Sequence, residues 1–217
     1  MKYSSKARTI LSIAFASVLC ACMGTVKPPE PIYYYTLDYS PPGPSFAAPV
    51  PFILRVERFS ASPPYNTARI VYADAGAHRN TYAYHQWIAA PGDLLPYLLA
   101  RDLEYTKGFQ AVFTPESAIR TTHNVHAWIE QFLEKDTAQN WTAAATLHAA
   151  LISRTAADPT DRILFQRRYS AESPCAAKTP AALAVAMGQV VSQISEAISR
   201  DIYQSLSAVG RSKKQGE

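Results

Sequence analysis

Cysteine is the residue type whose placement in this chain most clearly suggests chemistry, because two of its three cysteines stand one residue apart near the N-terminus. Cys20 and Cys22 close a short apolar run, 9–19, which follows a basic segment without any acidic residue. A basic segment followed by an apolar run of this size is typical of a secretion signal. The run is too short to span a bilayer, which takes about 20 apolar residues.

The residues before Cys22 match the bacterial lipobox, in which leucine stands three positions before the cysteine and a small residue stands directly before it. Leu19 and Ala21 occupy these positions, whereas Cys20 would be preceded by bulky Leu19. We therefore predict a lipoprotein signal peptide over 1–21, cleaved before Cys22. The Cys22 sulfur would then carry diacylglycerol, and a fatty acid such as palmitate would acylate the new amino terminus. An ordinary signal peptide with incidental cysteines is the alternative.

The segment after this cysteine predicts where the protein resides and how the rest is organised. Met23 is not aspartate, the residue that retains lipoproteins in the inner membrane of bacteria that sort by this position. We therefore expect a lipid-anchored protein in the outer membrane of a Gram-negative bacterium, facing the periplasm. Residues 22–31 form a proline-rich tether after the lipidated cysteine. One folded domain is predicted over 32–208, and a flexible basic tail over 209–217.

Charge and cysteine content exclude two further classes of protein. The chain has 21 basic and 17 acidic residues, but three basic residues and no acidic ones precede Cys22, so the mature chain is almost neutral. Nucleic acid is therefore not an expected partner. Once Cys22 is lipidated, Cys175 has no partner within the chain, which excludes a disulfide framework. A bridge between two chains through Cys175 remains open.

The sequence contains no arrangement typical of catalysis or of metal binding. It lacks G-x-S-x-G and H-E-x-x-H motifs, and its eight glycines include no phosphate-binding loop. His123 and His126 are three residues apart on a predicted strand, which places them on opposite faces. Asp158 and Asp161 flank a turn proline and are better explained as turn formers. We therefore predict no enzymatic activity, no metal site and no cofactor beyond the covalent lipid on Cys22.

Most of the elements that would position a functional surface are predicted to be strands. Strands are predicted where apolar residues alternate or where aromatic and β-branched residues are frequent. These segments are 32–39, 52–60, 68–74, 81–89, 109–113, 123–136, 140–154 and 162–173. Short turns join the last three segments, which predicts an antiparallel meander.

Two segments change to a helical period. A leucine-rich stripe follows Asp93, the predicted N-cap, with Pro96 expected in the first turn and Lys107-Gly108 at the end. The C-terminal helix is expected to start with Thr179 as its cap and Pro180 at its first position. Its apolar residues recur at steps of three and four, so one side should pack on the sheet and not enter a membrane. The fold class expected is α/β (α+β), a two-layer sandwich with a mostly antiparallel sheet and two main helices on one face.

Aromatic residues are dense in two stretches of the chain, 32–39 and 59–87. Cross-strand pairing within the sheet explains this density most simply. The alternative is that some of these side chains are exposed, since Tyr and Trp are enriched at protein interfaces.

The order of these segments resembles a known family. "YYYTLD" follows the lipobox and tether, then come "RVERFSASPPYNTARIVY" and "YAYHQWIAAP" before a leucine-rich helix, and "WIEQF" lies in the next long strand. This order is similar to that of the ABC-type transport auxiliary lipoproteins, the PqiC-like family, over nearly the whole mature chain. One departure is Ala73, where many members carry arginine.

The resemblance implies a non-enzymatic outer-membrane component of an MCE-type lipid transport system, in which the lipoprotein docks a periplasmic MCE-domain protein that conducts phospholipid across the periplasm. It further implies that Pro64, Tyr65, Tyr72, Tyr84 and Trp87 lie near the docking surface, although the same residues could equally be a structural signature of the family. A homo-oligomer would suit a conduit. The rival functions are a periplasmic carrier that holds the lipid itself, which would need a deep apolar cavity, and an envelope hydrolase.

Overall fold

The computed structural model describes residues 28–43, 46, 48–74, 76–158 and 160–215. The predicted lipobox with Cys22, and the tether up to residue 27, lie outside these residues. A compact body begins at Ile32. Its elements are β1 (Tyr33–Tyr35), β2 (Val50–Val56), β3 (Ser60–Ala61), η1 (Pro63–Tyr65), β4 (Arg69–Ala73), β5 (Asn80–Trp87), α2 (Pro91–Tyr105), β6 (Phe109–Phe113), β7 (His123–Asp136), β8 (Trp141–Ser153), η2 (Thr160–Arg162), β9 (Ile163–Pro174) and α3 (Pro180–Gln215).

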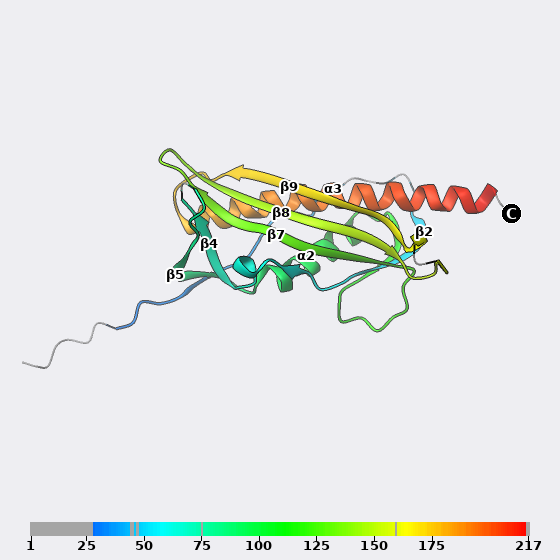
Figure 1. Ribbon diagram of the computed structural model, residues 1–217, viewed down its shortest axis with the longest axis horizontal. Helices are drawn as coiled ribbons and strands as arrows, with labels where there is room; N and C mark the ends of the chain where they lie inside the picture. The colour runs from blue at the N-terminus through cyan, green and yellow to red at the C-terminus, as the bar shows by residue number, and fades with distance from the viewer. Residues whose placement is uncertain (1–27, 44–45, 47, 75, 159, 216–217) are drawn as a thin grey trace, which may run out of the picture. The chain divides into compact units, whose positions relative to one another are not determined.

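The largest part of the sheet is the predicted meander of β7, β8 and β9, whose strands run antiparallel and side by side (Figure 1). The β7–β8 hairpin closes where the Thr137 amide donates to the Asn140 carbonyl oxygen at 3.0 Å. Apolar residues alternate along β7, so Val125 and Ile129 are fully buried while His126 and Trp128 are exposed. The bounds of these strands agree with the predicted ones to within one residue.

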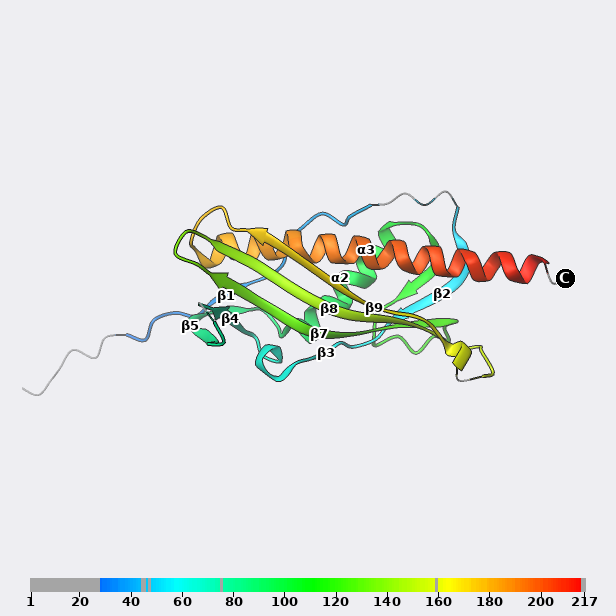
Figure 2. The same ribbon diagram turned by 45° about the horizontal axis from the view of Figure 1, so that its top comes forward.

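The other edge of β7 is built from short strands in a way that the sequence did not predict. β2, β3 and β4 follow one another along β7, and each of them runs parallel to it. The sheet extends from β4 through β5 to β1 and, separately, from β2 to β6. Figure 2 shows β1, β4 and β5 near one end of β7 and β2 near the other. Residues 50–73 thus form one interrupted path beside β7, and parallel pairing follows because the chain keeps its direction through the breaks. The mixed α/β fold class with two main helices is confirmed.

Helix α2 differs from its prediction at its start. Ala90, in extended conformation, is the N-cap and Pro91 opens the helix, so Asp93 lies in the first turn and the prediction of Asp93 as N-cap was wrong. Pro96 lies inside the helix, beyond the first turn. The end was predicted correctly: the helix stops before Lys107, whose φ of 54° places it in the left-handed region.

Helix α3 lies along β8 and β9 and provides much of the core. Thr179 caps it, since its Oγ1 accepts a hydrogen bond from the Ala182 amide at 3.2 Å. The stretch Pro180–Arg211 is long and apolar enough to cross a membrane by length and composition. Its apolar side nevertheless packs into the core through Leu183, Met187, Val190, Val191, Ile194, Ile198, Ile202 and Leu206. The helix continues to Gln215, through most of the predicted tail 209–217, and Val209 still packs against the core.

Candidate functional site

The five residues proposed for the docking surface divide between the core and the surface. Tyr65 in η1 and Trp87 at the end of β5 are buried, with 6% and 2% of their surface exposed. The Trp87 ring packs edge-on at 5.5 Å from a phenylalanine ring of β7. Tyr72 is half-buried, and only Pro64 and Tyr84 are exposed. Tyr65 and Trp87 are therefore part of the core, and a docking role for any of the five stays a prediction.

A second set of aromatic residues, around strand β1, is brought together by parallel pairing of β1 with β5. The Tyr33 ring stacks on the His85 ring at 5.3 Å, and the Tyr35 hydroxyl lies 2.9 Å from His85 Nδ1. We define the aromatic edge as the exposed apolar residues of this corner, namely Ile32, Tyr33, Tyr34, Tyr84 and Ile88. β1 has a strand neighbour on one side only, so this corner forms an edge of the sheet.

A buried carboxyl group lies behind this corner, near the end of β7. Glu134 has no exposed surface, and the Tyr82 hydroxyl lies 3.0 Å from each of its carboxylate oxygens. Burial raises the pKa of Glu134 to about 7, although the hydrogen bond from Tyr82 acts in the opposite direction. The Tyr72 ring lies 5.0 Å from the Tyr82 ring. The Glu134 carboxyl group therefore changes its protonation near neutral pH, and the stability of the fold changes with it.

The outer side of the meander carries a third feature, which we call the Trp128 face: Trp128, Glu130, His148 and Arg168. Trp128 is 41% exposed, and its ring lies 4.9 Å from that of His148. Glu130 accepts hydrogen bonds from Arg168 Nε at 2.9 Å and pairs with His148 Nε2 at 2.7 Å. The Arg168 and His148 partners lower the pKa of Glu130 to about 2, which keeps the carboxylate charged. The alternation of β7 already placed Trp128 beside Glu130 on one face, a signal that the sequence reasoning passed over.

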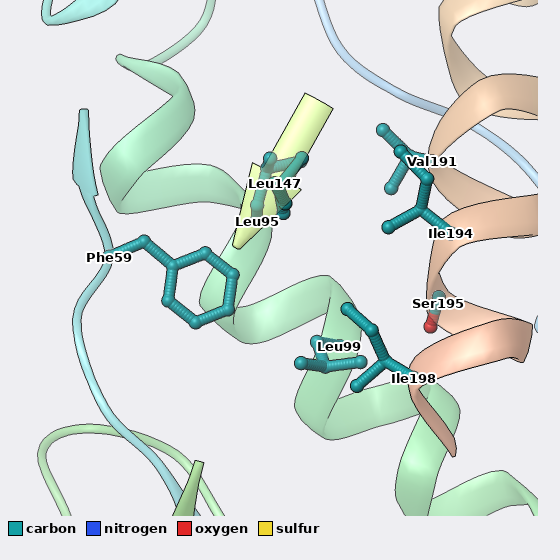
Figure 3. A pocket seen from close by; sticks show the side chains of 8 residues that line it. All are labelled: Phe59, Leu95, Leu99, Leu147, Val191, Ile194, Ser195 and Ile198. Carbon is teal, nitrogen blue, oxygen red and sulfur yellow. The ribbon is translucent and has the colours of Figure 1, made fainter. Parts of the chain in front are cut away.

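One apolar cavity lies between α2, α3 and the sheet (Figure 3). Its walls come from four segments: Phe59, Leu95, Leu99, Leu147, Val191, Ile194, Ser195 and Ile198. Its volume is about 20 Å³, room for about one water molecule. Ser195 Oγ is buried here without a hydrogen-bond partner. The cavity is too small to hold an acyl chain.

Groups for metal binding or nucleophilic chemistry do not converge in the part of the chain that the structure describes. No set of three His, Cys, Asp or Glu residues there is close enough to hold a metal ion. His123 is buried and His126 is exposed, as their opposite faces require. Cys175 is a buried free cysteine, and burial raises the pKa of its thiol, which lowers its reactivity.

Comparison with known proteins identifies a matching family and solved structures with a similar fold. A family model described as the ABC-type transport auxiliary lipoprotein component matches residues 35–199. No curated protein matches the chain. Among solved structures, protein XCC0632 of Xanthomonas campestris is similar, with a TM-score of 0.72, 20% identity, and coverage of 84% of this chain and 99% of that one. The hypothetical protein CT253 of Chlamydia trachomatis has a TM-score of 0.53 at 9% identity, covering 73% of this chain and 99% of its own.

At these identities the solved structures support the fold alone. The family match extends from β1 into α3 and includes the whole meander, the strands beside it and helix α2. The family is an auxiliary component of transport and not a known family of enzymes, and its members are lipoproteins that associate with a transport system. The chain therefore belongs to the family of ABC-type transport auxiliary lipoprotein components.

Proposed function

We propose that the protein is held in the outer membrane by lipid on Cys22, faces the periplasm, and docks the periplasmic MCE-domain protein of an ABC-type lipid transport system. In this role it is an adaptor and not a carrier. The lipobox before Cys22 and the absence of aspartate at Met23 support the anchor and the membrane. The family match over residues 35–199 supports association with a transport system.

The observation that carries the choice of adaptor over carrier is the size of the interior cavity. A protein that holds a lipid needs space for at least one acyl chain, and small-molecule sites usually enclose hundreds of Å³. The cavity between α2, α3 and β8 has about 20 Å³. The small side chains of β8 allow this close approach, since Ala143, Ala145 and Ala149 are all buried. Four larger hollows, of about 260–500 Å³, are each lined in part by a charged side chain such as Asp161, Arg58 or Asp74. The apolar interior between the helices and the sheet therefore has no room for an acyl chain, which favours an adaptor that offers its surface to a partner.

The surface that best suits a protein partner is the Trp128 face. Tryptophan is enriched at the centres of protein interfaces, and arginine is enriched there as well. Trp128 stands 41% exposed with its ring against His148, and Arg168 is held in place by Glu130. We propose that this face makes the main contact with the MCE-domain protein. Pro64, Tyr72 and Tyr84 are not part of the Trp128 face, so any contact that they make with the partner would be additional to it.

Affinity purification from membranes tests this function. The full chain, with a C-terminal tag, is purified in mild detergent beside its Cys22→Ala form, and bound proteins and phospholipids are both quantified. We expect an MCE-domain protein with the parent chain and a loss of that protein with the unanchored form. Stoichiometric phospholipid without a protein partner would contradict the adaptor and favour the carrier.

Two surface variants test the docking face in the same assay. Trp128→Ser is expected to reduce recovery of the partner by an order of magnitude or more, because aromatic residues central to interfaces contribute about 2 kcal/mol or more. Tyr105→Ser is the matched control, since Tyr105 is an exposed aromatic residue on α2. Equal recovery with both variants would mean that the partner binds elsewhere.

A further inference from the structure

We propose that the aromatic edge is a membrane-contact surface, which rests in the headgroup region of the same bilayer that holds the lipid anchor. The aromatic edge comprises the five residues defined above, Ile32, Tyr33, Tyr34, Tyr84 and Ile88. This inference rests on the proposed anchor at Cys22 and goes beyond it, because it gives the folded body a fixed orientation on the membrane.

The first argument is exposure. Between 43% and 58% of the surface of each of these five residues is open to solvent. Large apolar side chains gathered at one corner of a folded protein mark a contact surface more often than single exposed ones do. Register places four of them together: Tyr34 pairs with Gln86, so strand alternation puts Tyr34 and Ile32 on the same side as Tyr84 and Ile88. Tyr33 pairs with His85 and lies on the other side of the same edge strand.

The second argument is chemical character. Neither 31–37 nor 80–92 contains an aspartate, glutamate, lysine or arginine. Tyrosine has an apolar ring and a polar tip, and it is enriched at the level of lipid headgroups for that reason. The Trp128 face differs, since it includes the ion pair of Glu130 with Arg168. Pairing with Gln86 brings the exposed Arg69 of β4 to the same side, and a cation suits anionic headgroups. A tyrosine-rich edge whose own two segments carry no charge suits a lipid surface better than it suits a charged protein.

The third argument is the length of the chain between anchor and edge. Eleven positions separate Cys22 from Tyr33, the first residue of β1. At about 3.1 Å per residue a fully extended proline-rich segment would span about 34 Å, and a flexible one would average about 20 Å. Residues 32–34 of the aromatic edge are thus the part of the body that follows the anchor most closely in the chain. Tethering gives it a high effective concentration at the bilayer, so a weak contact suffices.

Photolabelling from lipid tests the orientation. The lipidated full chain is reconstituted into vesicles of phosphatidylethanolamine and phosphatidylglycerol with a trace of phospholipid that carries a diazirine near its headgroup. After irradiation, labelled positions are mapped by mass spectrometry. Peptides with residues 32–35 and 84–88 are expected to carry several-fold more label than peptides with Tyr105 or Trp128, which are exposed to a comparable extent but lie elsewhere. Even labelling of all these peptides, or label confined to the tether, would overturn the proposal.

Variants separate this contact from the anchor itself. A triple variant, Ile32→Ser with Tyr33→Ser and Tyr34→Ser, is expected to lower the label on residues 84–88 to the control level while leaving the chain folded by circular dichroism. The matched control replaces Tyr97 and Tyr105 of α2 by serine, and it should leave the labelling pattern unchanged. Unchanged labelling of 84–88 in the triple variant would also overturn the proposal.

The same experiment distinguishes failure of this inference from failure of the proposed function. Mass spectrometry of the purified chain reports acyl chains on Cys22 directly. An unacylated Cys22 would remove the anchor and therefore the proposed function as well. An acylated chain whose aromatic edge is unlabelled, or is covered by a co-purified protein instead of lipid, overturns only the membrane contact.

Discussion

The buried carboxyl group of Glu134 makes the stability of the fold depend on pH in a direction that can be tested. Its side chain has no exposed surface, and its hydrogen-bond partner is the Tyr82 hydroxyl. Burial is the largest cause of the raised pKa; the neighbouring Asp136 adds to it, whereas Tyr82 and Lys178 act against it. The folded chain therefore binds a proton at Glu134 at pH values where the unfolded chain has already lost it.

The sign and size of the effect follow from these values. Between the ordinary pKa of 4.5 and the folded value of about 7, the folded state holds more protons, so its stability falls as the pH rises through this window. The full difference corresponds to roughly 3 kcal/mol of unfolding free energy, lost by about pH 8. Glu134→Gln removes this titration. The new amide hydrogen atoms lack an assured acceptor, which costs about 1 kcal/mol at every pH.

Urea unfolding at several pH values between 5 and 8.5 measures this directly. At pH 5 we expect the Glu134→Gln variant to be as stable as the parent or about 1 kcal/mol less stable, and at pH 8.5 to be about 2 kcal/mol more stable. Glu104→Gln, at an exposed position of α2, controls for the loss of one negative charge. If the difference between Glu134→Gln and the parent is constant across the range, burial does not hold the proton and the reasoning is refuted.

Four further variants test the packing by urea unfolding. Trp87→Ala is expected to lower the unfolding free energy by about 3–5 kcal/mol, whereas Tyr84→Ala at the exposed edge should change it by less than about 0.5 kcal/mol; similar losses would contradict this assignment of core and surface. Gly92→Ala should destabilise by about 1–3 kcal/mol, because a Cβ there would lie 2.7 Å from the backbone oxygen of Phe59; an unchanged midpoint would show that the backbone can move aside. Ser195→Ala removes a buried hydroxyl without a partner and should leave stability equal or raise it by up to about 1 kcal/mol, so a clear loss would reveal a hidden hydrogen bond.

Elements with a long, regular pattern were predicted well from the sequence. The alternation over 123–136 reproduced strand β7 at both ends, and Thr179-Pro180 located the start of α3. Periodicity depends only on residues that are near one another in the sequence, so a pattern that extends over many residues can be recognised without the structure. The predicted strand 32–39 shrinks to the three residues of β1, because an edge strand ends where its single neighbour ends. The same limit explains the parallel pairing of β2, β3 and β4 with β7, since alternation specifies a face but neither a partner nor a direction.

The sequence alone identified the candidate anchor at Cys22, the residue types of the candidate surfaces and the family. It could not divide the aromatic residues between core and surface. Tyr65 and Trp87 are buried while Tyr34 and Trp128 are exposed. Only the tertiary structure decided this division, because a side chain is buried when the helices cover its face of the sheet. That cover comes from α2 and α3, which are distant in the sequence from most of the strands on which they pack.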